Sequence, residues 1–388
     1  MRYCSLSDLQ PGMILGRHVY GYSGDLLLAT GKALDEYFIT RLSELGFPGV
    51  YIEEKGYENI NPPEIVDGAL RASTEQLFSE CLEKLADLDI SDVVFEGSVE
   101  KSLTAHPELG KALPMGKIRN QVNLVVQDIL DQCTNQLPCL LLKTHGRYQI
   151  QHGMDTMLVA ILLGINFRFL YRELRQLALA AFMHDVGKSV LMKRGEANLG
   201  PEHPRYKDHP MIGGLIMLHS GDDLYTECAT IQQHHERQDG TGFPYGLKSE
   251  GKTPLQARGY HSGTIYRLAE IVSVADAYDI LTAGTYKSPL TPEKALFEVI
   301  NRSGTEFNPY IVKMLSRIIQ IFPVGSQVVI QKCSNPDLVR CRAIVSAVNV
   351  EKPHQCDLIL FQDQSGKSIP LTPITLAGDE SARLELKL

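Results

Sequence analysis

The sequence lacks the features that mark secreted, membrane-spanning and nucleic-acid-coating proteins. Its eight cysteines are scattered and form no Cys-x-x-Cys pair, which excludes a dense disulfide framework and zinc-finger spacing. No uncharged apolar run approaches the roughly 18 residues of a membrane helix, and the first residues contain no apolar segment of a signal peptide. The net charge of −8 offers no broad basic surface to duplex nucleic acid or an anionic membrane. We therefore expect a soluble, cytoplasmic protein.

What the sequence has is the composition of a folded chain with more than one domain. It holds 388 residues, of which 44% are hydrophobic and 22% are charged. These values exclude extensive disorder, and the length suits two or three domains. Changes in residue pattern predict a small α+β module over 1–60, a helical linker over 61–140, a helical domain over 141–322 and a small β appendage over 323–388. The predicted fold class is mainly α, with an all-helical domain between these flanking parts.

The hydrophobic spacing also predicts the elements inside these segments. The N-terminal module should run strand, turn, strand, helix, strand between residues 9 and 54. The linker should hold helices near 64–88 and 114–136 around a loop at 97–110. Alternating residues predict four strands in the appendage, at 327–330, 340–346, 357–361 and 383–386. We expect the appendage to be structural and to pack on the helical domain.

Histidine is concentrated in one stretch of the chain. Residues 145–235 hold eight of the twelve histidines. Within this stretch, His184 and Asp185 end a helix with periodic apolar residues. An imidazole and a carboxylate side by side could both bind metal, although a capped helix end is the alternative for this pair alone.

A second motif is more specific. His234, His235 and Glu236 are followed by Asp239-Gly-x-Gly and then by Phe243 and Pro244, a series that demands a tight, irregular loop. Two adjacent histidines at a helix end could reach one cluster if a cavity surrounds that end. The alternative is a surface pair before a turn.

Three further residues are candidates for the same cluster. His152 and His209 lie in helical patterns and, taken singly, suit ordinary core or surface positions. Asp276 follows a run of apolar and small residues, where a buried carboxylate needs a cation or a hydrogen-bond partner. Taken together with the two motifs, these residues predict a metal site.

This order of residues resembles the HD superfamily of metal-dependent phosphohydrolases, and the His-His-Glu-x-x-Asp-Gly-x-Gly-Phe-Pro series resembles its HD-GYP branch. The resemblance covers roughly residues 140–320. It implies hydrolysis of cyclic di-GMP to pGpG, with GMP open as a further product, through a hydroxide that bridges two metals. It also implies a ligand set, in which the carboxylate of Asp185 bridges the metals: His152, His184, Asp185, His209, His234, His235 and Asp276.

The resemblance further implies cofactors and catalytic residues. A set of histidine and carboxylate ligands without thiolate suits two ions of iron or manganese and leaves zinc, nickel and cobalt open. The catalytic residues would be His184, Asp185 and Lys188. Lys188 could neutralise phosphate or protonate the departing oxygen, or else be a solvated lysine at a helix end.

Substrate binding is assigned to five residues near these motifs: Gly242, Phe243, Pro244, Asp279 and Lys287. Asp279 lies one turn after Asp276, so it could instead orient a metal ligand from behind.

The chain departs from the family pattern at three places. Phe243 stands where the family usually has Tyr. The stretch 281–289 lacks the Arg that is expected to hold phosphate, which leaves Lys287 alone. Tyr148 replaces the Glu found in relatives with a third metal, and this favours a two-metal site.

Two other functions compete with cyclic di-GMP hydrolysis. The chain could be a signalling protein that binds a cyclic dinucleotide or a protein with little turnover, or a phosphohydrolase for another cyclic dinucleotide or nucleotide. The expected partner is a cyclic dinucleotide, with no duplex nucleic acid and no membrane. We also predict a protein partner for the N-terminal module and leave a homodimer open.

Overall fold

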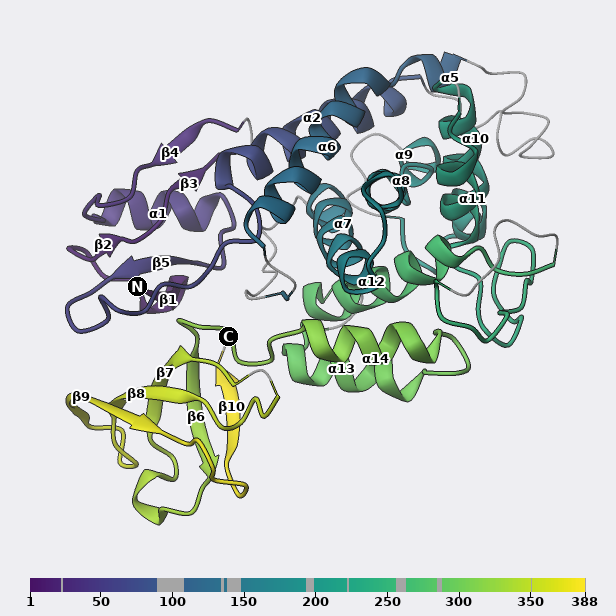
Figure 1. The fold of residues 1–388 in the computed structure, drawn as a ribbon. Coiled ribbons are helices and arrows are strands. Elements are labelled where there is room, and N and C mark those ends of the chain that lie inside the picture. The colour runs from purple at the N-terminus through teal and green to yellow at the C-terminus, as the bar shows by residue number, and fades with distance from the viewer. Residues whose placement is uncertain are drawn as a thin grey trace.

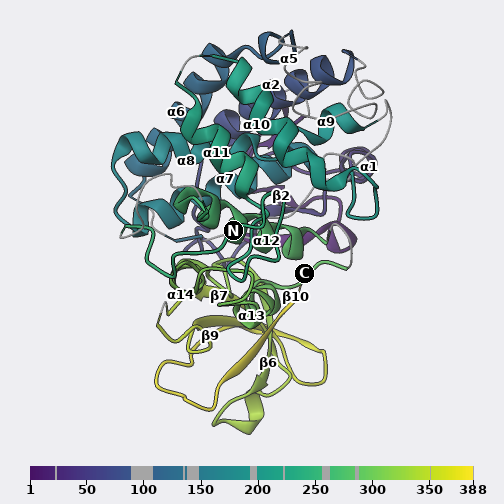
Figure 2. The same ribbon diagram turned by 90° about the vertical axis from the view of Figure 1, so that its right-hand side faces the viewer.

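The structure is a computed structural model. It describes residues 1–21, 24–88, 108–133, 136–137, 148–192, 199–221, 223–255, 263–284, 288–349 and 351–387. A small N-terminal sheet module, a large group of helices and a C-terminal five-stranded sheet follow one another along the chain (Figure 1). The predicted fold class is therefore confirmed. The turned view places the C-terminal sheet at one end of the helical part (Figure 2).

The described part of the N-terminal module contains the α-helix α1 (Glu36–Glu44), a 3-10 turn at Leu6–Asp8 and five short strands: β1 (Arg2–Ser5), β2 (Ile14–Leu15), β3 (Val19–Tyr20), β4 (Leu26–Leu28) and β5 (Gly49–Glu53). Three strands form a sheet in the order β1-β5-β2, and β3 pairs with β4. Helix α1 begins at Asp35, whose side chain accepts a hydrogen bond from Phe38 N. Strand β1 was not predicted, because its sequence Arg-Tyr-Cys-Ser contains no aliphatic residue.

The predicted linker forms helices α2 (Gly68–Ala86), α5 (Glu108–Lys111) and α6 (Met115–Asp131). Part of the predicted 97–110 loop lies outside the described residues. Arg71 on α2 forms an ion pair with Asp155, a buried residue of the helical domain, with 2.5 Å between Nη2 and Oδ1. Phe78 and Val125 pack in the same hydrophobic core as the helical domain. The core therefore does not end at the predicted boundary near residue 140.

The helical domain contains eight described helices: α7 (Tyr148–Asn166), α8 (Tyr171–Met183), α9 (Lys188–Leu191), α10 (His209–His219), α11 (Tyr225–Gln233), α12 (Arg267–Ala283), α13 (Pro292–Asn301) and α14 (Pro309–Ile318). Every residue of α7 from 151 to 164 is buried, so this helix lies in the centre and packs on α8 and α12. No helix within the described ranges has both the length and the hydropathy to cross a bilayer.

The C-terminal sheet is antiparallel and has the strand order β10-β6-β7-β8-β9. Its strands are β6 (Gln327–Lys332), β7 (Arg342–Ala347), β8 (Asp357–Gln362), β9 (Ser368–Thr375) and β10 (Arg383–Lys387). The four predicted strands are present. Strand β9 was missed because Pro370 and Pro373 interrupt its pattern, and an edge strand tolerates both prolines.

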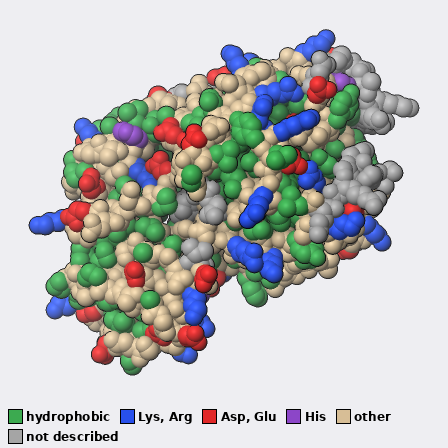
Figure 3. Space-filling view, in the orientation of Figure 1, with side chains coloured by type: hydrophobic (Ala, Val, Ile, Leu, Met, Phe, Trp, Pro, Cys, Tyr) green, Lys and Arg blue, Asp and Glu red, His purple; other side chains and the backbone are tan. Residues whose placement is uncertain are grey.

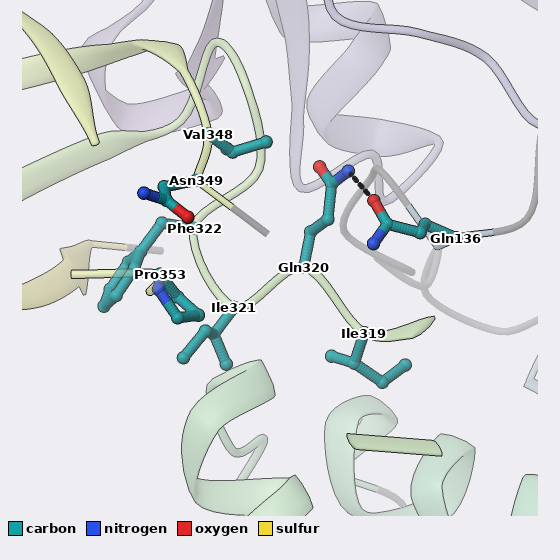
Figure 4. Close-up of a pocket in the computed structure, with 8 residues that line it drawn as sticks. All are labelled: Gln136, Ile319, Gln320, Ile321, Phe322, Val348, Asn349 and Pro353. Carbon is teal, nitrogen blue, oxygen red and sulfur yellow. Dashed lines mark hydrogen bonds between the residues drawn. The ribbon is translucent and has the colours of Figure 1, made fainter. Parts of the chain in front are cut away.

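The C-terminal sheet contacts several parts of the chain. Figure 4 shows the segment that leads into it, where the Gln320 side chain donates to Gln136 Oε1 at 2.9 Å. Ile344 of β7 is buried with Tyr57 and Ile60, which follow the N-terminal module. Tyr3 N donates to Gly325 O at 2.9 Å. The sheet thus has buried contacts with the N-terminal part. His354, between β7 and β8, also contacts the helical domain, with its Nε2 3.2 Å from Glu293 Oε1 on α13. The predicted packing of the appendage on the helical domain stays a prediction.

Candidate metal centre

The seven predicted ligands come together in two groups. Asp185, His209, His234 and His235 form one group, and His152, His184 and Asp276 form the other. Within each group the candidate ligand atoms all lie within 4.8 Å of one another. The residues come from the ends of helices α8 and α11, the start of α10 and the interiors of α7 and α12. Residues far apart in sequence are therefore brought to one buried place.

Backbone carbonyl groups orient three of the imidazole rings. The Nδ1 atoms of His184, His209 and His234 lie 2.6 to 2.7 Å from the carbonyl oxygen three residues earlier. Each Nδ1–H therefore donates, and a ring held in this way presents its Nε2 to the centre. This is the tautomer in which Nε2 can bind a metal.

The facing nitrogen atoms fit a metal ion. Nε2 of His209 lies 3.4 Å from Nε2 of His234, so two lone pairs point at each other. Burial, together with the neighbouring His184 and His209, lowers the pKa of His234 to about 3. Burial also holds the pKa of His235 well below its usual range. Neutral rings with converging lone pairs suit a divalent cation.

Asp185 belongs to the first group and also lies close to the second. Its Oδ2 is 3.5 Å from Nε2 of His152 and 3.6 Å from Nε2 of His184. Its Oδ1 is 3.2 Å from Nε2 of His209, yet this buried oxygen has no hydrogen bond with any described residue. Burial raises the pKa of this carboxyl, but Lys188 and His184 outweigh burial and hold it well below its usual range. An ionised carboxylate with one oxygen toward each group could help to hold a cation at either group.

Two carboxylates fix His152. Asp279 Oδ2 lies 2.7 Å from Nδ1, and Asp276 Oδ1 lies 3.1 Å from Nε2. Burial lowers the pKa of His152, but hydrogen bonds to these carboxylates outweigh it and raise the pKa to about 9. Asp279 is fully buried and is absent from the cavity lining, so the structure favours its orienting role over substrate contact.

Lys188 is buried and not solvated. Its side chain is 3% exposed, and Nζ lies 2.5 Å from Asp185 Oδ2. Nζ also lies 5.3 Å from the centre of the Tyr206 ring. The alternative of a solvated lysine at a helix end is therefore wrong. The structure makes Lys188 a counter-charge of Asp185.

A cavity of about 480 Å³ opens beside the two groups, and His235 and Asp276 contribute to its wall. Phe243 also lines it and stacks on His235, with 4.7 Å between ring centres. A side chain on Gly242 would lie about 2.5 Å from backbone atoms of 235–237, so this position needs glycine. Gly242 and Pro244 shape the loop and do not line the cavity. Lys287 lies outside the described residues.

Several residues that support the site were not predicted. Glu236 accepts hydrogen bonds from Tyr245 N and Leu247 N, which holds the loop after the histidine pair. Glu270 on α12 accepts from Gln238, Ser249 and Asn308. Glu270 could have been predicted as a supporting residue, because it is a carboxylate in an otherwise apolar helix. Tyr148, at the position of the family's additional Glu, stacks on His152 with 5.1 Å between ring centres.

Part of the chain matches a family model, and longer stretches are similar to named proteins. Residues 150–281 match the HD domain family model. Cyclic di-GMP phosphodiesterase PA4108 of Pseudomonas aeruginosa is 26% identical over 233 residues, which are 58% of this chain and 53% of that protein. The cyclic di-GMP phosphodiesterase response regulator RpfG of Xanthomonas campestris pv. campestris is 36% identical over 41% of this chain and 39% of that protein.

A third relative carries a different name. The 3'3'-cGAMP-specific phosphodiesterase 2 of Vibrio cholerae is 31% identical over 35% of this chain and 25% of that protein. The chain thus spans about half or less of the length of these relatives. The resemblance to the HD superfamily is thus confirmed over residues 150–281, where the chain matches the HD domain family model.

Proposed function

We propose that this chain is a metal-dependent phosphodiesterase that hydrolyses cyclic di-GMP to pGpG, with GMP as a further product. The placement of Asp185 carries this proposal, because one carboxylate oxygen faces each of the two ligand groups. Such an arrangement suits two adjacent divalent ions. His235 and Asp276 line a cavity, so a phosphodiester could reach both groups.

The metals and the chain have separate tasks in this reaction. When bound, two divalent ions would activate a water molecule and offset the charge on the phosphoryl oxygens. The chain fixes the ligand rings through their Nδ1 contacts and keeps Asp185 ionised through Lys188. Hydrolysis then adds the water oxygen to phosphorus, breaks one bond from phosphorus to a sugar oxygen, and gives that oxygen a proton.

The ligand set also supports a choice of metal. Histidine and carboxylate oxygen make up both groups within the described residues, and no thiolate joins them. We propose iron or manganese, which suit such ligands, while zinc, nickel and cobalt stay compatible. Lys287 is proposed to bind phosphate, since the residues on either side of the 285–287 stretch, Gly284 and Ser288, line the cavity.

Metal content and hydrolysis should be measured on one anaerobically purified sample, with iron and manganese each supplied. About two ions per chain together with pGpG would support the proposal. Two ions without any product would favour the signalling protein that binds without turnover, and titration with cyclic di-GMP would then measure that binding. A chain that binds no metal would contradict the whole site assignment.

The same assay should also include a second substrate, 3'3'-cGAMP. The missing Arg in 281–289 and the relative named for 3'3'-cGAMP favour a phosphohydrolase for another cyclic dinucleotide. Faster hydrolysis of 3'3'-cGAMP than of cyclic di-GMP by the same sample would establish this alternative.

A further inference from the structure

Two arginines lie around one carboxylate on the wall of the cavity. Arg237, Arg302 and Glu306 all line it. Arg237 Nη2 lies 3.5 Å from Glu306 Oε1, and Arg302 Nη1 lies 3.7 Å from Glu306 Oε2. One oxygen of the carboxylate thus faces each guanidinium group. The Glu306 carboxylate occupies a place where a phosphate group would meet both arginines.

Backbone hydrogen bonds hold the two arginines near the metal ligands. Arg237 is two residues after His235, and the following residues Gln238 and Asp239 donate their N–H groups to the carbonyl oxygens of Glu306 and Thr305, at 3.3 and 3.1 Å. Glu306 N in turn donates to Arg302 O at 3.0 Å. The turn that carries Arg302 is therefore joined to the loop that follows the histidine pair.

The ion pairs with Glu306 are easily replaced. Both distances are longer than a good hydrogen bond. The Arg237 and Arg302 side chains are 47% and 39% exposed, so water screens their attraction to the carboxylate. A phosphate can form short, paired hydrogen bonds with each guanidinium, which a loose contact with Glu306 does not provide.

We propose that Arg237 and Arg302 bind the second phosphodiester of a cyclic dinucleotide while the first lies at the metal centre. This inference rests on the proposed function and assigns the residues that recognise its substrate. A cyclic dinucleotide has two phosphodiester groups, and the metals neutralise only one of them. Phe307, Ile280 and Leu290 give the same cavity an apolar wall for a nucleobase.

The test compares a substrate that has two phosphodiesters with one that has a single phosphodiester. Arg302→Ala and Arg237→Ala should each raise the KM for cyclic di-GMP about tenfold, the effect of losing a charge-assisted hydrogen bond. Hydrolysis of bis(p-nitrophenyl) phosphate, which has one phosphodiester, should change less than about twofold. Arg302→Lys keeps the charge but loses the paired hydrogen bonds, so it should recover only part of the loss. Arg41→Ala, on an exposed arginine of α1, is the matched control.

The Glu306→Gln variant distinguishes a change in phosphate binding from damage to the fold. The carboxylate competes with phosphate for both guanidinium groups, so its removal should lower the KM for cyclic di-GMP, whereas a damaged fold would raise it. Equal effects of the arginine substitutions on both substrates, or no effect on either, would overturn the inference.

The substrate assignment can be wrong even if the two arginines do bind a phosphodiester, and the experiment distinguishes these two failures. If the unaltered chain hydrolyses bis(p-nitrophenyl) phosphate but not cyclic di-GMP, the substrate assignment is wrong. Titration of the metal-loaded chain with cyclic di-GMP then decides on the subsite: weaker binding in Arg302→Ala supports it. Equal binding, or no binding by the unaltered chain, refutes it.

Discussion

The carboxylate of Asp279 lies 2.7 Å from Nδ1 of His152 and so turns Nε2 of the same ring toward Asp276 and Asp185. The Asp279 side chain is fully buried, and its position one turn after Asp276 on α12 is what places it behind the ring. A residue that makes no contact with the cavity therefore determines the orientation of a candidate ligand.

Asp279→Ala should lower metal affinity about 10- to 100-fold, because His152 loses the partner that orients its ring. Metal titration followed by elemental analysis measures this effect. With saturating metal, the KM for cyclic di-GMP should stay near its original value, since Asp279 does not contact substrate. Asp131→Asn, at the exposed end of α6, is a control that should change neither quantity. A KM change without a loss of metal would assign Asp279 to substrate binding.

Asp185→Asn keeps the shape of the side chain but removes the charge that faces both ligand groups. Metal content should fall below two ions per chain, and turnover should disappear. His184→Ala should have the same two effects. Normal activity in either variant would contradict the shared two-metal mechanism.

Lys188→Met removes the positive charge 2.5 Å from Asp185 Oδ2. Without metal, the buried carboxylate loses its partner, and the free energy of unfolding should fall by about 3 kcal/mol. Bound metal should restore most of this loss, because the ions then neutralise Asp185. Turnover of the loaded protein should fall about 100-fold if Lys188 also assists proton transfer. Full activity at normal metal content would limit Lys188 to balancing the charge of Asp185.

Phe243→Tyr restores the residue that the family usually has. The ring already stacks on His235, so the added hydroxyl changes one edge and not the position of the ring. We expect kcat/KM for cyclic di-GMP to change less than about fivefold, the scale of one ordinary hydrogen bond. A much larger gain would show that the phenol oxygen takes a direct part in catalysis.

Glu227→Gln should stabilise the fold at neutral pH. Glu227 on α11 is 5% exposed, and its Oε2 has no hydrogen-bond partner among the described residues. Burial raises the pKa of this carboxyl above its usual value, so its contribution to stability is present at low pH and is lost as the pH rises through the raised pKa. The amide should therefore raise the free energy of unfolding by about 1 kcal/mol at pH 7.

The stabilisation by Glu227→Gln should depend on pH, and this dependence tests its cause. Denaturant unfolding at a series of pH values should show the advantage of Gln disappear as the pH falls below the pKa of an ordinary glutamate. Glu380→Gln, at a side chain that is 83% exposed, should show no such dependence. A gain that persists at low pH would indicate improved packing and not the removal of a buried charge.

Five of the seven candidate ligands lie in a local motif or in an unusually apolar setting, whereas His152 and His209 became candidates only together with the others. His184 with Asp185, and His234 with His235, are adjacent in sequence, and Asp276 interrupts an apolar helix. The helices of the central domain were predictable for a similar reason, since α8 has periodic apolar residues. Strands β1 and β9 were not, because β1 contains no aliphatic residue and β9 contains two prolines.

The rest of the site depends on contacts that no local pattern contains. Arg302 and Arg237 meet around Glu306 only because the α13–α14 turn folds against the loop after the histidine pair. The burial of Lys188 depends on its contact with Tyr206, from another segment, so spacing alone left its environment open. Backbone carbonyls fix the tautomers of three histidines, and a sequence does not show which carbonyl a ring will reach.

The shared core of α2, α6 and α7 makes the cooperative unit larger than the segment that matches the HD domain family. Phe78 and Val125 lie outside residues 150–281, yet both are buried in the core that supports His152. Their amide protons should therefore exchange with solvent as slowly as those of α7, because one opening event would expose all of them. Excision of residues 150–281 alone would leave this apolar surface bare, so the excised segment would aggregate before its chemistry could be measured.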